Sequence, residues 1–594
     1  MSDKAAQTVV PGQPVLPPLD FPVTWDDPQD AKITWLTFSQ YRTSIRPFIY
    51  AVIDAFTVGG NIGLEKAGLP FEARMSRINT FAYIGMAPKA APPEVVMKAM
   101  GLISRAAPSM FKAMMGKVGA GMSKQQEVAL NPIIERFDTY WHEELLPEIK
   151  QHLAYFESSD LRGMSLDQLR AHLAEAMRRT ECIGAIHHKI LMPMLFAMSQ
   201  FEEFYCELFA GATTLDALRL TQGFDNLTVK SDEALWQLSR TARAIPEVHT
   251  ILAKYTASEV ILALEKLPAS KPFLAELRSW LAEYGQRLNA VFNLNEPSWI
   301  EEPTPAIRNL QAYITLPDRQ PETENVAVVE RETAVATARA QLTGYPQPVV
   351  TRFETLLKAA QIATIVHEDH NVWIDQRFFY HIRRIAAEFG VRLAQTGILD
   401  AADDVFYLTP EELQANGNSS LKPLVQQRKA EMAHFGQMTP PPMLGTAPPF
   451  DLSDSGSMVR AIFKGEMAQA NGSQPAANLL QGLGGSVGVV QGTARVIHSL
   501  DEAGRLQSGD VLVTVATEPS WTPLFATAAA VVTDNGGVLS HTAVVAREYR
   551  IPAVVGASIA TKTIRDGQLV EVNGTDGTVR ILVEETTHEP ALAG

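Results

Sequence analysis

The densest group of residues that could carry chemistry is a glycine-rich segment that ends at His541. It begins at Thr533, where an apolar run stops, and contains Gly536, Gly537 and Ser540 before a helical pattern starts. The glycines would let the backbone approach a ligand closely, and the start of a helix offers free N–H groups and positive dipole potential to an anion. An imidazole nitrogen is a good nucleophile near neutral pH. The segment therefore predicts a histidine that accepts a phosphoryl group.

A second interpretation of His541 is that it only caps the start of a helix. A single histidine after a Gly-Gly turn is more often a cap than a nucleophile. Arg547 lies six residues further along the same helical pattern, and that spacing gives it a weaker expected role. The residues on both sides of the segment favour the nucleophile over the helix cap, because they carry the family resemblance given below.

The elements that would position His541 form a β-rich region after residue 483. Short β-branched runs are bounded there by Gly and Asp, which is typical of strands in a compact domain of about 100 residues. The expected strands are Ser486–Val490, Ala494–Ile497, Val511–Val515, Ala530–Thr533, Ala553–Val555, Leu569–Val572 and Thr578–Leu582.

The rest of the sequence predicts three further parts. Helical periodicity rich in Ala, Leu, Glu, Gln and Arg extends through residues 21–414. Residues 415–482 are rich in Pro, Gly, Ser and Met and predict a linker or hinge. Residues 1–20 predict a flexible leader without the pattern of a signal peptide. We therefore expect a multidomain protein with a large, mainly α-helical domain and a β/β/α domain over residues 483–594.

Composition and charge narrow the function classes. The 51 Lys and Arg residues against 66 Asp and Glu residues give a formal net charge of −15, so no global positive field would gather a nucleic acid. The two cysteines, Cys182 and Cys206, cannot form a disulfide framework for 594 residues and suit a reducing cytoplasm. The apolar stretch Ile183–Phe196 is interrupted by titratable residues at positions 187–189, so we expect no membrane-spanning segment.

The C-terminal region resembles the swivelling phosphohistidine domain of the phosphoenolpyruvate-utilising enzymes. Matching motifs run in order from Gly485 to Leu582 and include Thr517–Pro523 and the segment around His541. The resemblance implies that His541 is phosphorylated by ATP and that the domain then carries the phosphoryl group to a second site. The residues expected to hold that group are Thr517, Ser540, Gly536 and Gly537.

The helical region resembles the acceptor-binding domain of rifampin-phosphotransferase-like proteins. Looser motifs, including Trp25–Trp35, Phe273–Arg287 and Gly397–Leu413, keep the order of that domain. Phosphoenolpyruvate synthases also contain an ATP-grasp domain and a pyruvate-binding TIM barrel, and we find no segment here that resembles either. The sequence therefore resembles phenylphosphate-synthase-type enzymes, and this resemblance implies that a separate subunit binds ATP.

Transfer from phosphohistidine to a hydroxyl needs a base for the proton and cations or N–H donors for the phosphoryl oxygens. The polar segment 367–377 supplies both kinds of group. The candidate bases are His367 and His370, and the candidate substrate- or phosphate-binding residues are Arg377, Asn371, Glu368, His187, His188 and Arg287.

Each of these candidates also has a structural interpretation. The segment 367–377 could be a solvated helix face, His187 and His188 could be core histidines, and Arg287 could form an ion pair with Glu301. No His, Cys, Asp and Glu group has zinc-like spacing, so no metal site is expected.

The leading hypothesis is a cytoplasmic, ATP-dependent phosphotransferase of the dikinase type. Its acceptor would be the hydroxyl of a small phenol-like aromatic, as the resemblance to phenylphosphate synthases of phenol degradation implies. ATP and Mg²⁺ are expected on an ATP-grasp subunit in a heteromer, with the covalent phosphohistidine on this chain and no nucleic-acid or membrane partner. The alternatives are an antibiotic or alcohol acceptor, or a phospho-carrier protein without a small acceptor of its own.

Overall fold

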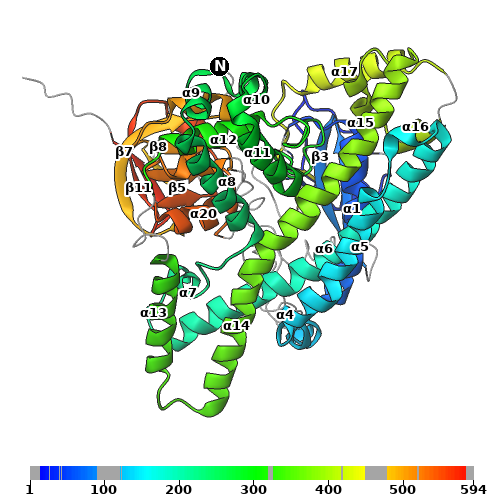
Figure 1. Cartoon of the computed structure of the whole chain (residues 1–594). Coiled ribbons are helices and arrows are strands. Elements are labelled where there is room, and N and C mark those ends of the chain that lie inside the picture. Colours follow the sequence, from blue (N-terminus) through cyan, green and yellow to red (C-terminus); the bar gives the residue numbers. More distant parts are fainter. Residues whose placement is uncertain are drawn as a thin grey trace, which may run out of the picture. The chain divides into compact units, whose positions relative to one another are not determined.

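The structure is a computed structural model that describes residues 14–25, 27–38, 41, 43–89, 121, 124–318, 326–415, 419–447, 478–517, 521–538 and 540–582. The chain divides into two compact units (Figure 1). One unit comprises residues 1–317 and 332–470, and the other comprises residues 318–331 and 471–594.

The C-terminal unit is built on one mixed, eight-stranded sheet with the strand order β5-β12-β11-β7-β8-β9-β10-β6. Strands β7, β8, β9 and β10 are mutually parallel, and the outer pairs are antiparallel. The strands are β5 (Leu479–Gln481), β6 (Leu483–Ser486), β7 (Val489–Val496), β8 (Val511–Thr514), β9 (Ala530–Thr533), β10 (Ala553–Val555), β11 (Leu569–Asn573) and β12 (Thr578–Ile581). Its short helices are α19 (Thr522–Phe525), α20 (His541–Tyr549) and α21 (Ala560–Thr563).

Both faces of this sheet are buried, which explains the β-branched runs in the sequence. Val511 and Val513 of β8 enter one core cluster, whereas Leu512 between them enters the other, as the twofold alternation of a strand requires. The expected strands Ser486–Val490 and Ala494–Ile497 are divided differently in the structure. β6 ends at Ser486, and β7 runs unbroken from Val489 to Val496, because Gly492 pairs with Val570 of β11. The expected β-rich domain is confirmed.

The N-terminal unit is mainly helical, as expected. Its principal helices are α1 (Pro47–Lys66), α4 (Phe137–Thr139), α5 (Leu146–Glu157), α6 (Leu166–Leu208), α7 (Thr214–Arg219), α8 (Leu227–Ala244), α9 (Pro246–Lys254), α10 (Ala257–Glu265), α11 (Lys271–Tyr284), α12 (Thr304–Thr315), α14 (Gln347–His370), α15 (Phe379–Gln395), α16 (Pro410–Ala415) and α17 (Lys422–Phe435). A π-helical segment, η5 (Asn371–Phe378), joins α14 directly to α15. The division between the two units falls within α13 (Val326–Gln341).

The helical unit also contains a four-stranded sheet that the helical periodicity did not predict. Its order is β2-β3-β1-β4, formed by β1 (Thr34–Thr37), β2 (Phe71–Ile78), β3 (Phe81–Pro88) and β4 (Met443–Gly445). Asn79 and Thr80 connect β2 to β3 with φ values of 48° and 72°, which is the backbone of a two-residue hairpin turn. Asn in a two-residue turn is the sequence signal that could have revealed this hairpin.

Parts of the expected leader and hinge are structured. Within residues 1–20, the described part begins at Pro14, which bridges to Thr446, and Val15 donates a backbone hydrogen bond to Gly445. Within residues 415–482, helix α17 and strand β4 form, and Leu36 of β1 pairs with Met443. Residues 448–477, where the rest of the hinge was predicted, lie outside the described residues.

Close contact between α1 and α6 organises the helical unit (Figure 1). A Cβ atom at Gly59 would lie 1.8 Å from the carbonyl oxygen of Glu181, and one at Gly184 would lie 2.0 Å from that of Phe56. A Cβ at Gly63 would lie 2.4 Å from Cβ of His188. Only glycine allows backbones to approach this closely, so these positions fix the separation of the two helices.

The same two helices are long and apolar enough, by length and composition, to span a membrane. In the most apolar window of each, 61% of α1 and 56% of α6 is buried inside the fold. A core helix of a globular protein has the same composition, and α1 and α6 bury their apolar faces against each other.

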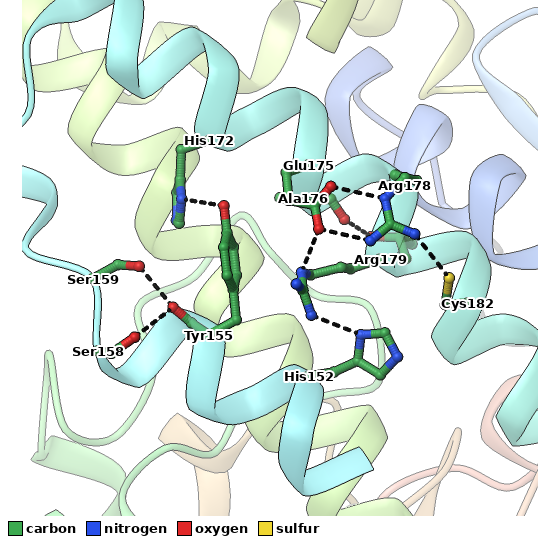
Figure 2. A network of polar contacts seen from close by, with 11 residues as sticks. His152, Tyr155, Ser158, Ser159, His172, Glu175, Ala176, Arg178, Arg179 and Cys182 are labelled. Atoms are coloured by element: carbon green, nitrogen blue, oxygen red, sulfur yellow. Dashed lines mark hydrogen bonds and ion pairs between the residues drawn. The ribbon is translucent and has the colours of Figure 1, made fainter. Parts of the chain in front are cut away.

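A polar network joins α5 to α6 (Figure 2). The Tyr155 hydroxyl lies 2.9 Å from Nδ1 of His172, and their rings stack with centroids 5.0 Å apart. The Arg179 guanidinium lies 4.0 Å from the Tyr155 ring centroid and donates to Nδ1 of His152 at 3.1 Å. Burial, followed by the charge of Arg179, lowers the pKa of His152 to about 4. His152 is therefore neutral in the folded protein at pH 7.

The glycine contact predicts that Gly184→Ala destabilises the helical unit. The new Cβ would meet the Phe56 carbonyl at 2.0 Å, so the backbones of α1 and α6 must move apart, at a cost of about 1–3 kcal/mol. Calorimetric unfolding should show a lower Tm. Gly121→Ala is the matched control, because Gly121 is exposed and a Cβ there meets nothing within 4 Å. Equal Tm values for the two variants would contradict the packing argument.

The low pKa of His152 predicts a loss of stability in acid. Between pH 6.5 and about 4 the unfolded histidine takes up a proton that the folded one does not, so stability falls as the pH falls through this window. His152→Gln removes this titration. The Tm difference between His152→Gln and wild type should shift in favour of the variant from pH 7 to pH 4. Parallel Tm profiles of the two proteins would show that His152 does not contribute.

Candidate functional site

His541 is the first residue of α20 and lies at the carboxyl edge of the parallel strands. β9 ends at Thr533, and the connecting residues 534–540 lead to α20, with position 539 outside the described residues. The neighbouring parallel strand β8 leads to Thr517 at the same edge, where ligands of parallel sheets bind. Oγ1 of Thr517 lies 2.8 Å from Oγ1 of Thr542 in a buried contact. The structure thus brings Thr517 to the start of the helix that carries His541.

The two glycines before His541 differ in what they do. Gly536 has φ of 110°, and a Cβ there would lie 2.8 Å from Oγ of Ser540. The backbone N–H of Ser540 donates to the Gly537 carbonyl at 3.0 Å, which closes the turn. A Cβ at Gly537 would meet nothing within 4 Å. Gly536 is therefore required by the turn itself, whereas Gly537 faces open space before the helix.

Arg547 contacts this loop directly, although its spacing from His541 predicted only a weaker role. Its Nη2 donates to the backbone carbonyl of Val538 at 2.9 Å, and its Nη1 has no hydrogen-bond partner in the described part of the chain. Burial lowers the pKa of Arg547 to about 10, so the guanidinium stays charged at neutral pH. Helical side chains point toward the helix N-terminus, so the Arg547 side chain extends back to the loop before His541. An argument from residue spacing alone does not include this direction. A buried positive charge therefore supports the loop that precedes His541.

A second cluster of titratable residues forms inside the helical unit. His187 of α6, His370 at the end of α14 and Asp375 of η5 offer ligand atoms that all lie within 4.8 Å of one another. Nε2 of His187 is 4.0 Å from Oδ1 of Asp375, and the two histidine ring centroids are 5.2 Å apart. The sequence predicted both histidines as site residues from distant segments, and the structure brings them together. The sequence placed Asp375 inside the polar segment 367–377 but did not mark it as a site residue.

Burial controls the charge of this cluster. It lowers the pKa of His370 to about 4 and that of His187 well below its usual range, in both cases before the effect of neighbouring histidines. Burial alone raises the pKa of Asp375 to about 7. Nδ1 of His370 donates to the Val366 carbonyl at 2.8 Å, which leaves the Nε2 lone pair available. The cluster therefore presents neutral imidazoles beside a carboxyl group that titrates near neutral pH.

Aromatic side chains lie against one side of the cluster. The Phe56 ring centroid is 5.0 Å from that of His187, and it is 5.5 Å from those of both Phe292 and Phe379. All three phenylalanines are buried. The surroundings of His187 on this side are thus apolar.

The other predicted acceptor residues near the cluster make local contacts. Nδ1 of His188 donates to the Gly184 carbonyl at 3.0 Å, and Nδ1 of His367 lies 3.3 Å from Oε1 of the buried Glu368. The ring centroid of His367 is 5.9 Å from that of His370. The Asn371 side chain accepts from Gln376 at 3.3 Å, within the π-helical segment. His367 therefore adjoins the cluster, and Asn371 stabilises the backbone that carries Asp375.

The two predicted arginines make contacts of their own. Arg377 donates to Glu157 at 3.1 Å and to Gln286 at 3.2 Å. Arg287 is buried over the Trp299 ring, which lowers its pKa to about 10. An ion pair between Arg287 and Glu301 was one interpretation of the sequence. This prediction is wrong, because Glu301 pairs with Arg383 at 3.1 Å. Arg383 is held there by a second hydrogen bond to the Leu294 carbonyl.

Two protein-family models match parts of this chain. Residues 506–577 match the mobile domain of PEP-utilising enzymes, and residues 187–368 match the fourth domain of rifampicin phosphotransferase. The first match contains His541 and the second begins at His187. The chain therefore combines a PEP-utilising mobile domain, which implies a covalent phosphohistidine intermediate, with a rifampicin-phosphotransferase-type domain.

Its particular relatives include rifampicin phosphotransferases. The protein of that name from Streptomyces sviceus is 33% identical over 365 residues, which cover 60% of this chain and 40% of that protein. The uncharacterized phosphotransferase YvkC of Bacillus subtilis is 27% identical over 402 residues, covering 67% and 47%. Chondramide synthase cmdD of Chondromyces crocatus is 36% identical over 592 residues, covering 96% and 14%. The chain thus spans less than half the length of each of these relatives.

The loop geometry predicts different effects for alanine at the two glycines. Gly536→Ala forces a side chain into φ of 110° and against Ser540, which should lower the stability of the C-terminal unit by about 1–3 kcal/mol. Gly537→Ala is the matched control and should change stability far less. Thermal unfolding of both variants in the full chain measures the difference. If Gly537→Ala were the more damaging of the two, the assigned roles of the glycines would be reversed.

Proposed function

We propose that this chain transfers a phosphoryl group from His541 to a hydroxyl of an organic acceptor bound in the helical unit. The observation that carries the proposal is the position of His541, at the N-terminus of α20 on the carboxyl edge of parallel strands. It lies within the segment that matches the PEP-utilising mobile domain. Helix N–H groups, the open turn at Gly537 and the charge of Arg547 all favour an anion there.

Two transfers at phosphorus make up the proposed reaction. In the first, an imidazole nitrogen of His541 attacks the β-phosphorus of ATP, and the bond from that phosphorus to the oxygen of AMP breaks. Water then releases the γ-phosphate as inorganic phosphate and leaves one phosphoryl group on the histidine. In the second, the acceptor oxygen attacks that phosphorus, the N–P bond breaks, and the hydroxyl proton passes to a base in the helical unit. Both nucleophiles act on the same phosphoryl group, so His541 is free again after each turnover.

The acceptor is proposed to be an alcohol hydroxyl of a largely apolar molecule, such as an antibiotic. The names of the rifampicin phosphotransferases support this choice over a phenol, because their similarity extends into the helical unit. Within that unit, the side of His187 next to Phe56, Phe292 and Phe379 is the proposed acceptor site. Apolar rings would hold the acceptor body, and the neutral imidazoles would accept its hydroxyl hydrogen bond.

ATP and Mg²⁺ are proposed to act on an ATP-grasp partner, and the reaction is proposed to take place in the cytoplasm. The support for the partner is chemical: phosphorylation of His541 requires an ATP-binding site that comes into contact with this residue. A mobile carrier domain can reach such a site on another subunit. The long match to chondramide synthase cmdD supports both units acting together, since it runs through 96% of this chain.

The test follows the labelled phosphoryl group. The full chain, alone or with an ATP-grasp protein, is incubated with Mg²⁺ and ATP labelled on its β-phosphate. Wild type should acquire acid-labile label with the partner, and His541→Ala should lose at least about 99% of it, because the nucleophile is gone. His498→Ala is the matched control, since His498 is an exposed histidine of the same unit.

Acceptors are then added to the labelled chain. Discharge by an alcohol-bearing antibiotic supports the proposal, whereas discharge by phenol alone would replace it with the phenol-phosphorylating hypothesis. Label at His541 that no acceptor removes would point to a carrier protein. Label that persists in His541→Ala would refute the assigned nucleophile.

A further inference from the structure

We propose that His187, His370 and Asp375 form a binding site for one divalent transition-metal cation of the zinc class. The three side chains come from three elements: His187 from the middle of α6, His370 from the end of α14, and Asp375 from the π-helical segment η5. Their ligand atoms lie within 4.8 Å of one another. All three elements belong to the helical unit, so the site depends on the packing of that unit alone.

The distances fit a site that closes on a cation. Nitrogen and carboxylate ligands bind such cations at about 2.0–2.2 Å, which places neighbouring ligand atoms roughly 3.0–3.5 Å apart. The 4.0 Å between Nε2 of His187 and Oδ1 of Asp375 is close to this value. Rotation of the Asp375 carboxyl and a small turn of an imidazole would bring the ligands to bonding distance.

The surroundings of the ligands have the features of a metal site. Nδ1 of His370 donates to the Val366 carbonyl at 2.8 Å, which fixes the ring and directs Nε2 as a ligand. Nδ1 of His187 is buried and has no hydrogen-bond partner among the described residues. Nε2 of His187 is the nitrogen that faces Asp375, so it is the nitrogen that would bind the cation.

The charge of the site also calls for a cation. Asp375 is buried, and no Lys or Arg in the described residues lies within ion-pair distance of its carboxylate. A divalent ion would stabilise that carboxylate far more than the neutral imidazoles do. Two histidines and one carboxylate favour Zn²⁺, Mn²⁺ or Fe²⁺ over Mg²⁺, which prefers oxygen ligands.

Three protein ligands leave coordination positions open. With a cation bound, the imidazole lone pairs are occupied, so the acceptor oxygen would bind the cation at an open position instead of donating a hydrogen bond to a histidine. The cation would then lower the pKa of the acceptor hydroxyl and prepare it for attack on phosphorus. This role rests on the proposed function, whereas metal binding itself does not. Zinc binding without label on His541 would therefore overturn the proposed reaction and leave the metal site intact.

The experiment measures zinc binding by the full chain after treatment with a chelator. Calorimetric titration with Zn²⁺ should show one strong site per chain, and Mg²⁺ should give no comparable signal. Asp375→Asn and His370→Gln should each weaken the affinity by at least about 100-fold, because each loses a direct ligand. His172→Gln is the matched control, since His172 is a buried histidine of α6 that bonds to Tyr155 instead.

A second measurement guards against variants that fail to fold. Co²⁺ added to the wild-type chain should give visible absorption bands, which Zn²⁺ should remove by displacement. Zn²⁺ should also raise the Tm of wild type and of His172→Gln, because a ligand of the folded state stabilises it. The proposal is overturned if wild type binds neither ion at millimolar concentration, or if folded Asp375→Asn binds zinc as wild type does.

Discussion

The helical unit depends on the close approach of α1 and α6. Backbone atoms at Gly59 and Gly184 come so near the opposite helix that any Cβ would overlap a carbonyl oxygen. This approach places the Phe56 ring 5.0 Å from that of His187, and the same helix α6 packs against α14, which carries His370. The positions of the cluster residues therefore follow from the absence of side chains at a few glycines, because larger residues there would separate the helices that carry them.

A different constraint positions His541. Four parallel strands end at one edge of the sheet, and a parallel strand must be followed by a connection that leaves from this edge. The connection after β9 turns sharply at Gly536 and enters α20 at once, so the helix N-terminus faces the edge. Arg547 then returns from the body of α20 to the carbonyl of Val538. The loop is thus held from both sides.

The strands and the loop of the C-terminal unit could be predicted because their signals are local. β-branched runs, bounding glycines and the Gly536-Gly537 turn all lie within a few residues of what they determine. The sheet of the helical unit could not be predicted, because Leu36 pairs with Met443 from a distant part of the sequence. Nothing in the sequence of either short segment indicates this pairing. His187 and His370 were predicted singly from their types. Asp375 lay within the predicted polar segment 367–377 but was not named, because acids in helices are usually exposed and only tertiary packing buries this one.

The two candidate centres have opposite electrostatic character, and this contrast bears on the chemistry. The loop before His541 combines a helix N-terminus with a buried arginine, which stabilises the negative charge of a phosphoryl group. The cluster in the helical unit combines neutral imidazoles with one buried carboxyl group, which can bind a hydroxyl or a cation. A protein that carries a phosphoryl group to an uncharged acceptor needs these two environments apart. An arginine beside Asp375 would lower the pKa of its carboxyl group and so weaken that group as a base for the proposed transfer.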